Sequence, residues 1–129
     1  MIFDSDVLIW FLRGDPAAIE LLDSTPDRAL SIVSFMEVQQ GAKSNREMKT
    51  TRDLFQQRGF RILPLSESIG HIAAGLIEKH ALSCGLHLED ALIAATAGDA
   101  RETLVTGNVR HFRHIANLNL KPFRPRAAR

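Results

Sequence analysis

The chain begins MIFDSDVLIW, residues 1–10, and this stretch decides the class of fold. Residues 1–3 are apolar, and Asp4 follows them directly. A short apolar run that polar residues bring to an end is typical of a strand buried in a parallel sheet. Asp6 comes next, where a carboxylate either caps a helix or serves as a ligand, and capping is the preferred interpretation for this residue. Asp4 lies deeper, against apolar neighbours, where an unpaired charge is costly.

The same alternation of short apolar runs and longer helix-period segments continues along the chain. Further strands are expected at residues 29–33, 60–63 and 103–105, and an edge strand, limited by Pro122, at residues 118–123. Helices are expected between them, at residues 16–22, 34–42, 46–58, 66–80 and 88–97. This order predicts the α/β class: a three-layer α/β/α sandwich with a central, mainly parallel sheet of four to five strands.

Length and composition favour one globular domain spanning residues 1–129. The 45% hydrophobic and 24% charged residues are ordinary for such a protein. The longest apolar runs fall well short of the roughly 20 residues that a membrane span needs. No basic segment precedes an apolar one at the N-terminus, and the lone Cys84 cannot form an internal disulfide. A cytoplasmic protein without a membrane anchor is therefore expected.

The charge of the chain is unevenly placed. No acidic residue follows Glu102, whereas six basic residues do: Arg110, Arg113, Lys121, Arg124, Arg126 and Arg129. A basic C-terminal tail, from about residue 121, is either a solvated terminus or a surface for an anionic partner.

Four polar residues fall where a parallel sheet would gather them. Ligands of open α/β sheets bind beyond the carboxyl ends of the strands. Asp4, Glu37, Asp90 and Asn108 follow expected strands or begin expected helices. Each has an ordinary explanation alone: Glu37 can form a capping box with Ser34, Asp90 can complement a helix dipole, and Asn108 can belong to a turn. Together they predict an acidic cleft.

Such a cleft suits a hard cation, Mg²⁺ or Mn²⁺, because carboxylate oxygens are the preferred ligands of these ions. The cation would remove the mutual repulsion of the carboxylates. Zinc is disfavoured, since the five histidines show no pair at the usual ligand spacing and only one cysteine is present.

Four segments, read together, resemble the motifs of PIN domains. They are IFDSDVLI at residues 2–9, SFME at 34–37, DALIAATA at 90–97 and LVTGNVRHF at 104–112. They occur in the family's order and cover nearly the whole chain. The size is most similar to VapC-type toxins of bacterial toxin–antitoxin modules.

The resemblance implies a Mg²⁺- or Mn²⁺-dependent endoribonuclease, usually a homodimer, inhibited by a small cognate antitoxin. Asp4, Glu37 and Asp90 match the metal-binding acids of the family. The fourth acid falls at Asn108, which departs from the pattern because an amide brings no charge. Gly107 stands where an Arg is frequent, and His111 where many members have an acid. The number of metal ions therefore stays open.

The catalytic set implied by the resemblance is Asp4, Glu37, Asp90 and Asn108, with a metal-activated water attacking an RNA phosphodiester. Ser5 is assigned to substrate binding or to a hydrogen bond with a metal ligand. Arg110 and Arg113 are assigned to RNA phosphates. Phosphate contacts of this kind give an affinity that falls with salt.

Two other functions fit parts of the sequence. Residues 2–8 also resemble the first motif of haloacid-dehalogenase-type phosphatases, in which the first Asp is a nucleophile. The later Lys and acidic pair of those enzymes have no clear counterpart here. Alternatively, Asn108 marks a catalytically inactive PIN-like module that binds RNA or protein. Convergence of Asp4, Glu37 and Asp90, without an Arg or Lys between them, would favour the enzyme.

Overall fold

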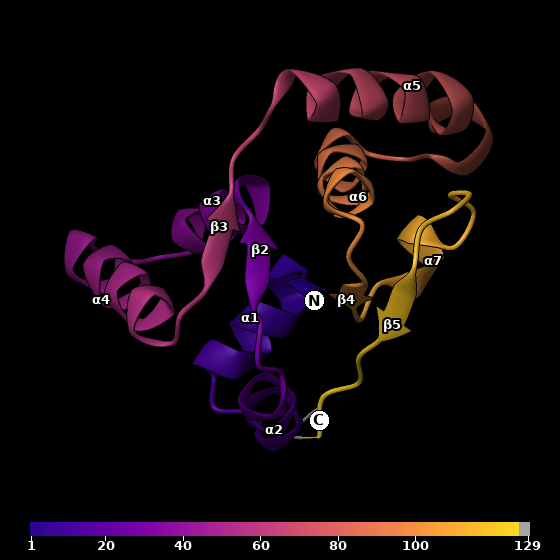
Figure 1. The fold of residues 1–129 in the computed structure, drawn as a ribbon. Coiled ribbons are helices and arrows are strands. Elements are labelled where there is room, and N and C mark those ends of the chain that lie inside the picture. The colour runs from indigo at the N-terminus through magenta and orange to yellow at the C-terminus, as the bar shows by residue number, and fades with distance from the viewer. Residues whose placement is uncertain (127–129) are drawn as a thin grey trace.

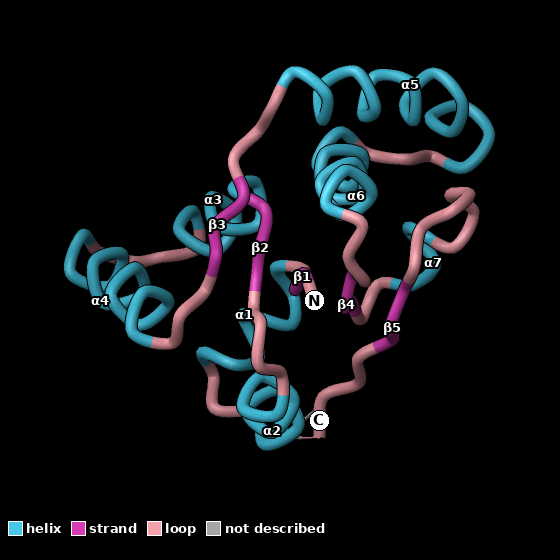
Figure 2. The backbone as a smooth tube through the Cα atoms, viewed as in Figure 1, coloured by secondary structure: helices cyan, strands magenta, loops and turns pink. Residues whose placement is uncertain are grey.

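The computed structural model describes residues 1–126 and arranges them as alternating strands and helices (Figure 1). The strands are β1 (Ile2–Phe3), β2 (Ala29–Ser31), β3 (Arg61–Leu63), β4 (Leu104–Thr106) and β5 (Leu120–Pro122). The helices are α1 (Ser5–Leu12), α2 (Pro16–Ser24), α3 (Ile32–Gln40), α4 (Asn45–Gln57), α5 (Glu67–Cys84), α6 (Leu88–Ala100) and α7 (Val109–Phe112). Figure 2 shows how short the strands are beside the helices that cover them.

The strands form one sheet in the order β3-β2-β1-β4-β5, and each pair of neighbours is parallel. The central strand is β1, in which Ile2 pairs with Ala29 on one side and Leu104 on the other. The chain builds the sheet outward from β1 to β3 and then crosses to β4, so the order reverses between β1 and β4. Ligands of such sheets bind at this switch point, beyond the carboxyl ends of the two strands.

Two hydrophobic cores lie on opposite faces of the sheet. Ile2, Ala29 and Leu104 face a core shared with α5, α6 and α7. Their neighbours Phe3, Leu30 and Val105 face a core shared with α1, α2 and α4. All six side chains are fully buried, as expected where both faces of a parallel sheet are covered. The arrangement confirms the predicted three-layer α/β/α sandwich.

Helix α3 begins earlier than the sequence indicated. Ser31 is its N-cap, and the Ser31 hydroxyl accepts a hydrogen bond from the amide of Val33 at 3.0 Å. The predicted strand at residues 29–33 is therefore shorter, and the predicted capping box between Ser34 and Glu37 is wrong. Both residues lie within the helix, three positions apart, and so share one face of it.

Two helices were not among those expected. Helix α1 starts directly after β1, and its N-cap is Asp4 rather than Asp6, because Asp4 Oδ1 accepts a hydrogen bond from the Ser5 amide at 2.8 Å. The short α7 follows β4. At the other end of the chain, β5 forms the expected edge strand, in which Pro122 is opposite Thr106. Prolines are tolerated at such an edge.

Part of the basic tail packs against the rest of the molecule. The guanidinium of Arg126 lies 2.9 Å from a carboxylate oxygen of Glu20, and its amide donates to Asp15, so this part of the tail lies along α2. Arg129, also counted in the tail, lies outside the described residues. No helix among residues 1–126 is both long enough and apolar enough to cross a membrane.

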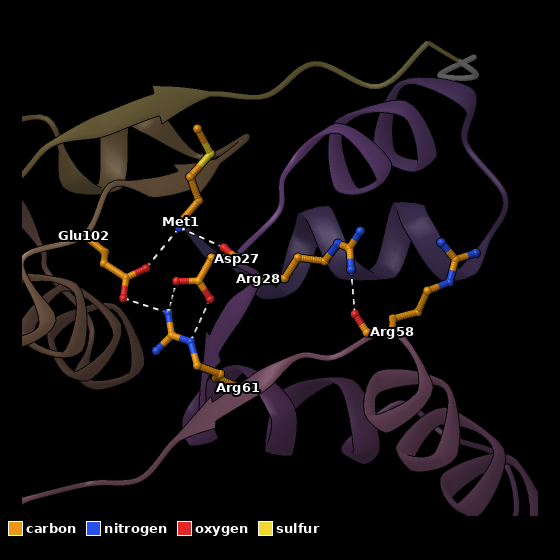
Figure 3. Close-up of polar contacts among 6 residues, drawn as sticks. All are labelled: Met1, Asp27, Arg28, Arg58, Arg61 and Glu102. Atoms are coloured by element: carbon orange, nitrogen blue, oxygen red, sulfur yellow. Dashed lines mark hydrogen bonds and ion pairs between the residues drawn. The ribbon is translucent and has the colours of Figure 1, made fainter.

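At the amino ends of the strands, ion pairs join four neighbouring strands, β3, β2, β1 and β4 (Figure 3). The Glu102 carboxylate binds the amino group of Met1 at 3.0 Å and the guanidinium of Arg61 at 2.9 Å. Arg61 also makes two hydrogen bonds with the Asp27 carboxylate, at 2.8 and 3.1 Å. Charge is therefore balanced at this edge of the sheet, which lies opposite the switch point.

The substitution Glu102→Gln should lower the free energy of unfolding by about 1 kcal/mol at pH 7, because the partners are partly exposed. Burial opposes ionisation of Glu102, but Arg61 and the amino terminus together lower its pKa below 4.5. A lowered folded-state pKa gives stability that is lost as the pH falls through it. Urea unfolding at pH 7 and pH 3 should therefore show the difference only at pH 7. Glu78→Gln, at an exposed glutamate on α5, is the matched control and should have no effect at either pH.

Candidate functional site

Asp4 lies at the switch point and connects its two strands. Its side chain is only 4% exposed. Asp4 Oδ1 accepts from the Ser5 amide, and Oδ2 accepts from the hydroxyl of Thr106 at 2.7 Å. The Thr106 oxygen in turn accepts from the Asn108 amide at 3.0 Å. These contacts hold the carboxylate at the carboxyl end of β1 and leave each of its oxygens a further lone pair.

Asp6 is tied to β4 as well, at the residue after its end. Its Oδ2 accepts a hydrogen bond from the Gly107 amide at 2.9 Å. A Cβ atom at Gly107 would lie 2.5 Å from this oxygen and 3.3 Å from the carbonyl oxygen of Phe123. A side chain at residue 107 would therefore displace the Asp6 carboxylate and weaken its contact with β4.

Glu37 reaches the site from α3, and Ser5 reaches it from α1. Burial raises the pKa of Glu37, and the nearby Ser5 hydroxyl opposes this rise. Glu37 Oε1 is buried and has no hydrogen-bond partner among the described residues, and the same holds for Ser34 Oγ one turn earlier. A buried carboxylate oxygen without a donor is costly, so this oxygen is free to accept a proton or to bind a cation.

Asp90 lies in the first turn of α6, and its side chain is 18% exposed. His111 of α7 places Nδ1 at 3.3 Å from Asp90 Oδ2. The neighbouring Glu89 is exposed. Asp90 therefore does not point freely into solvent, and its partner is the side chain of His111.

The carboxylates raise one another's pKa values. Burial and the charge of Asp6, with a smaller effect of Glu37, raise the pKa of Asp4 to about 7. Burial is also the largest cause that raises the pKa values of Asp6, Glu37 and Asp90. The charges of Glu89, Asp90 and Asp6 act on Glu37 in the same direction. These mutual effects require that the acids of β1, α1, α3 and α6 share one neighbourhood.

Within residues 1–126, no Lys or Arg forms an ion pair with these acids. The ligand atoms of Asp4, Glu37 and Asp90 do not all lie within 4.8 Å of one another. Unshielded carboxylates repel, so wider spacing is expected without a cation. Oxygen-only ligands, uncompensated charge and the unpartnered oxygen of Glu37 fit a hard divalent cation.

The arginines predicted to bind substrate lie beside Asp90. Arg110, Arg113 and His111 line a pocket of about 310 Å³ together with Asp90, and the other lining residues are Cys84, Gly85, Leu86 and His87. Asn108 is exposed, and its side chain makes no capping bond with α7. The pocket therefore brings one acid of the site, Asp90, beside two arginines.

Two contacts of the site were not predicted from the sequence. They are the hydrogen bond of Thr106 with Asp4 and that of Gly107 with Asp6. The two partners in each contact lie about a hundred residues apart in the chain, so the spacing of nearby residues does not predict the contact. The polar T-G-N run after a strand was the available signal, and a turn explained it equally well.

Comparison with known proteins gives a consistent result. A family model described as the PIN domain matches residues 1–118. A chain of a toxin–antitoxin complex from Klebsiella pneumoniae is 31% identical, with a TM-score of 0.79 over 95% of this chain and 97% of that chain. A chain of FitAcB from Neisseria gonorrhoeae is 26% identical, with a TM-score of 0.70 over 92% and 94% of the two chains.

VapBC2 from Rickettsia felis, solved with a DNA fragment from its promoter, contains a chain that is 24% identical. Its TM-score is 0.79 over 96% of this chain and 100% of that chain, which shows the same fold. A comparison with curated proteins finds no match.

The raised pKa of Asp4 predicts how stability without metal depends on pH. A folded-state pKa of about 7, against 3.8 for the free side chain, means that the native protein loses stability as the pH rises from about 4 to 7. Asp4→Asn removes this loss and keeps both hydrogen bonds, because the Asn oxygen can accept from Ser5 and its amide can donate to Thr106.

In EDTA, the Asn variant should be more stable than the wild type at pH 8, by up to about 4 kcal/mol, since each unit of pKa difference equals about 1.4 kcal/mol. At pH 4 the two proteins should be equally stable. Urea unfolding at both pH values checks this. Equal stability of the two proteins at pH 8 would contradict the conclusion that ionised Asp4 destabilises the native protein.

Proposed function

The chain belongs to the PIN domain family, and we propose that it is a metal-dependent endoribonuclease and the toxin of a toxin–antitoxin pair. One observation carries the proposal: the buried Asp4, at the switch point of the sheet, and the half-buried Glu37 and Asp90 form no ion pair with a Lys or Arg among residues 1–126. The 31% identity to a chain of a toxin–antitoxin complex supports the second part.

Asp4, Glu37 and Asp90 would hold Mg²⁺ or Mn²⁺. When bound, such a cation supplies a nucleophile at neutral pH and stabilises the charge that develops on a phosphodiester. Asn108, at the position of a fourth acid, offers an amide oxygen and no charge. The smaller total charge favours one tightly held cation.

The other side chains of the site position these acids. Thr106 and the Ser5 amide fix the Asp4 carboxylate, and the Ser5 hydroxyl lies beside Glu37. His111 holds Asp90 from α7. Because these contacts come from different elements, the acids are oriented before substrate arrives, which lowers the free energy needed to organise the site.

Arg110 and Arg113 would bind RNA phosphates on the way to the acids. They lie on and beside α7, in the pocket that includes Asp90. The chain has no Tyr and one Trp, so it offers few rings on which bases could stack. Recognition of the backbone and shape of a folded RNA fits this surface better than reading of a flexible single strand.

The antitoxin would bind in the groove between α1, α3 and α4. This groove has a volume of about 500 Å³, and its apolar lining includes Ile9, Leu12, Val38 and Leu54. Glu37 also lines it, so the groove leads to the acidic site. An apolar segment that carries a basic residue would therefore cover the groove and neutralise the acids together.

The proposal also includes assembly into a homodimer and a location in the cytoplasm. Leu82 and Leu88, near the connection between α5 and α6, are 102% and 63% exposed. Burying these exposed leucines in a homodimer would remove apolar surface from water.

The PIN family match leaves the phosphatase alternative without support. The inactive binding module remains the second candidate, because Asn108 replaces an acid. It predicts a folded protein that binds RNA or its partner protein but does not cleave RNA with any divalent cation.

Cleavage of total RNA by the purified, antitoxin-free protein tests the proposal. Mg²⁺ or Mn²⁺ should give discrete fragments and EDTA none. Asp4→Asn and Asp90→Asn should reduce the rate on the order of 10³-fold or more, since metal ions supply several kcal/mol of transition-state stabilisation. Asp53→Asn, at an acid on α4 paired with Lys49, is the control and should cleave like the wild type.

Cleavage that survives EDTA and both site substitutions would overturn the metal mechanism. A folded wild type that binds RNA without cleaving it would favour the binding module instead.

Replacing Arg110 and Arg113 with Ala should weaken RNA binding without affecting the fold, because both side chains are exposed. If each makes one phosphate contact, the slope of log affinity against log salt should become shallower by about 1.4 for single-stranded RNA. Filter binding at several salt concentrations measures this slope. The control is Arg52→Ala, at an exposed arginine on α4, which should leave the slope unchanged.

A further inference from the structure

A second cluster of ligating side chains lies apart from the acids. His80 and Cys84 come from the last turns of α5, and His114 comes from the segment after α7. One ligand atom from each residue lies within 4.8 Å of the other two. Among residues 1–126, this is the one set of three that is so compact. The rings of His80 and His114 meet edge to face, with centroids 4.7 Å apart.

Zinc was not expected from the sequence, because no histidine pair has the usual ligand spacing and there is only one cysteine. The structure nevertheless brings three ligating residues together in space. Cys84 follows His80 by four residues within one helix, so the two side chains share a face. His114 arrives from thirty residues further along, because α7 packs against α6 and the same core.

The cluster contains a buried polar atom that nothing satisfies. His114 Nε2 has no hydrogen-bond partner among the described residues. His80 is also buried, at 7% exposed. Neutral imidazoles with free lone pairs are what a metal ion requires. The exposed Cys84 leaves the cluster open to solvent on one side.

We propose that His80, Cys84 and His114 form a Zn²⁺ site with three protein ligands and one open position for water. Two imidazoles and a thiolate suit zinc in tetrahedral coordination, and they suit Mg²⁺ and Mn²⁺ poorly. Binding replaces the thiol proton of Cys84 with the metal, and the proton passes to water. The acidic site and this site therefore select different cations from the same solution.

The position of the cluster indicates what zinc would do. Figure 1 shows the end of α5 turning toward the segment that follows α7. Cys84 also lines the pocket that contains Asp90, Arg110 and Arg113. A Zn²⁺ bridge between α5 and His114 would thus brace the basic wall of this pocket. The inference extends beyond the nuclease proposal, since zinc binding needs no RNA and no acidic site.

Zinc binding to the whole protein, reduced and freed of metal, tests the inference. Titration against a chromophoric chelator, with excess Mg²⁺ present to occupy the acids, should give one Zn²⁺ per chain. Cys84→Ser and His114→Gln should weaken the affinity about 100-fold or more, because loss of an outer-sphere partner alone costs roughly 10- to 100-fold. Co²⁺ should give a thiolate charge-transfer absorption in the wild type and none in Cys84→Ser.

Two variants serve as controls, and circular dichroism verifies that each variant is folded. His71→Gln, at an exposed histidine on the same helix, and Asp90→Asn, at the acidic site, should both bind Zn²⁺ like the wild type. The inference is overturned if the wild type binds no Zn²⁺, if Cys84→Ser or His114→Gln binds it with unchanged affinity, or if Asp90→Asn abolishes binding. None of these results depends on RNA cleavage, so the nuclease proposal stands or falls separately.

Discussion

The buried carboxylate of Asp4 is the constraint on which the functional edge of this protein depends. It ends the central strand, caps α1 and accepts the hydroxyl of Thr106 from the neighbouring strand. One side chain therefore joins β1, α1 and β4 at the point where the strand order reverses. The same burial that makes this junction specific raises the pKa of Asp4 to about 7, so ionisation of Asp4 costs folding free energy unless a positive charge lies near.

Charge is balanced at one end of the strands and not at the other. At the amino ends of the strands, Arg61 bridges Asp27 and Glu102, and the amino terminus completes the balance. At the carboxyl ends, the acids have no Lys or Arg partner among the described residues, and His111 contacts only Asp90. Stability is thus built at one edge, whereas the other keeps uncompensated charge, as functional sites commonly do.

Local patterns located most elements, because period-2 and period-3.6 apolar spacing reflects only a residue's near neighbours. They located the start of α3 less well. Ser31 and Ser34 are both acceptable N-caps, and the Glu at residue 37 favoured the second. Pairing of Ala29 with Arg61 and of Ser31 with Leu63 ends β2 at Ser31 and makes it the cap. Propensity could not choose between the two serines, since the decision came from the neighbouring strand.

The sequence by itself determined the class of fold, the order of its elements and the presence of Asp4, Glu37 and Asp90 at strand ends or in helices beside them. These follow from residue type and short-range periodicity. Only the tertiary structure decided which side chains meet. Thr106 reaches Asp4 and Gly107 reaches Asp6 across more than a hundred residues, and His114 joins His80 and Cys84 across thirty. The physical reason is that strand order and helix packing bring such pairs together, and neither is encoded in the spacing of the residues that finally touch.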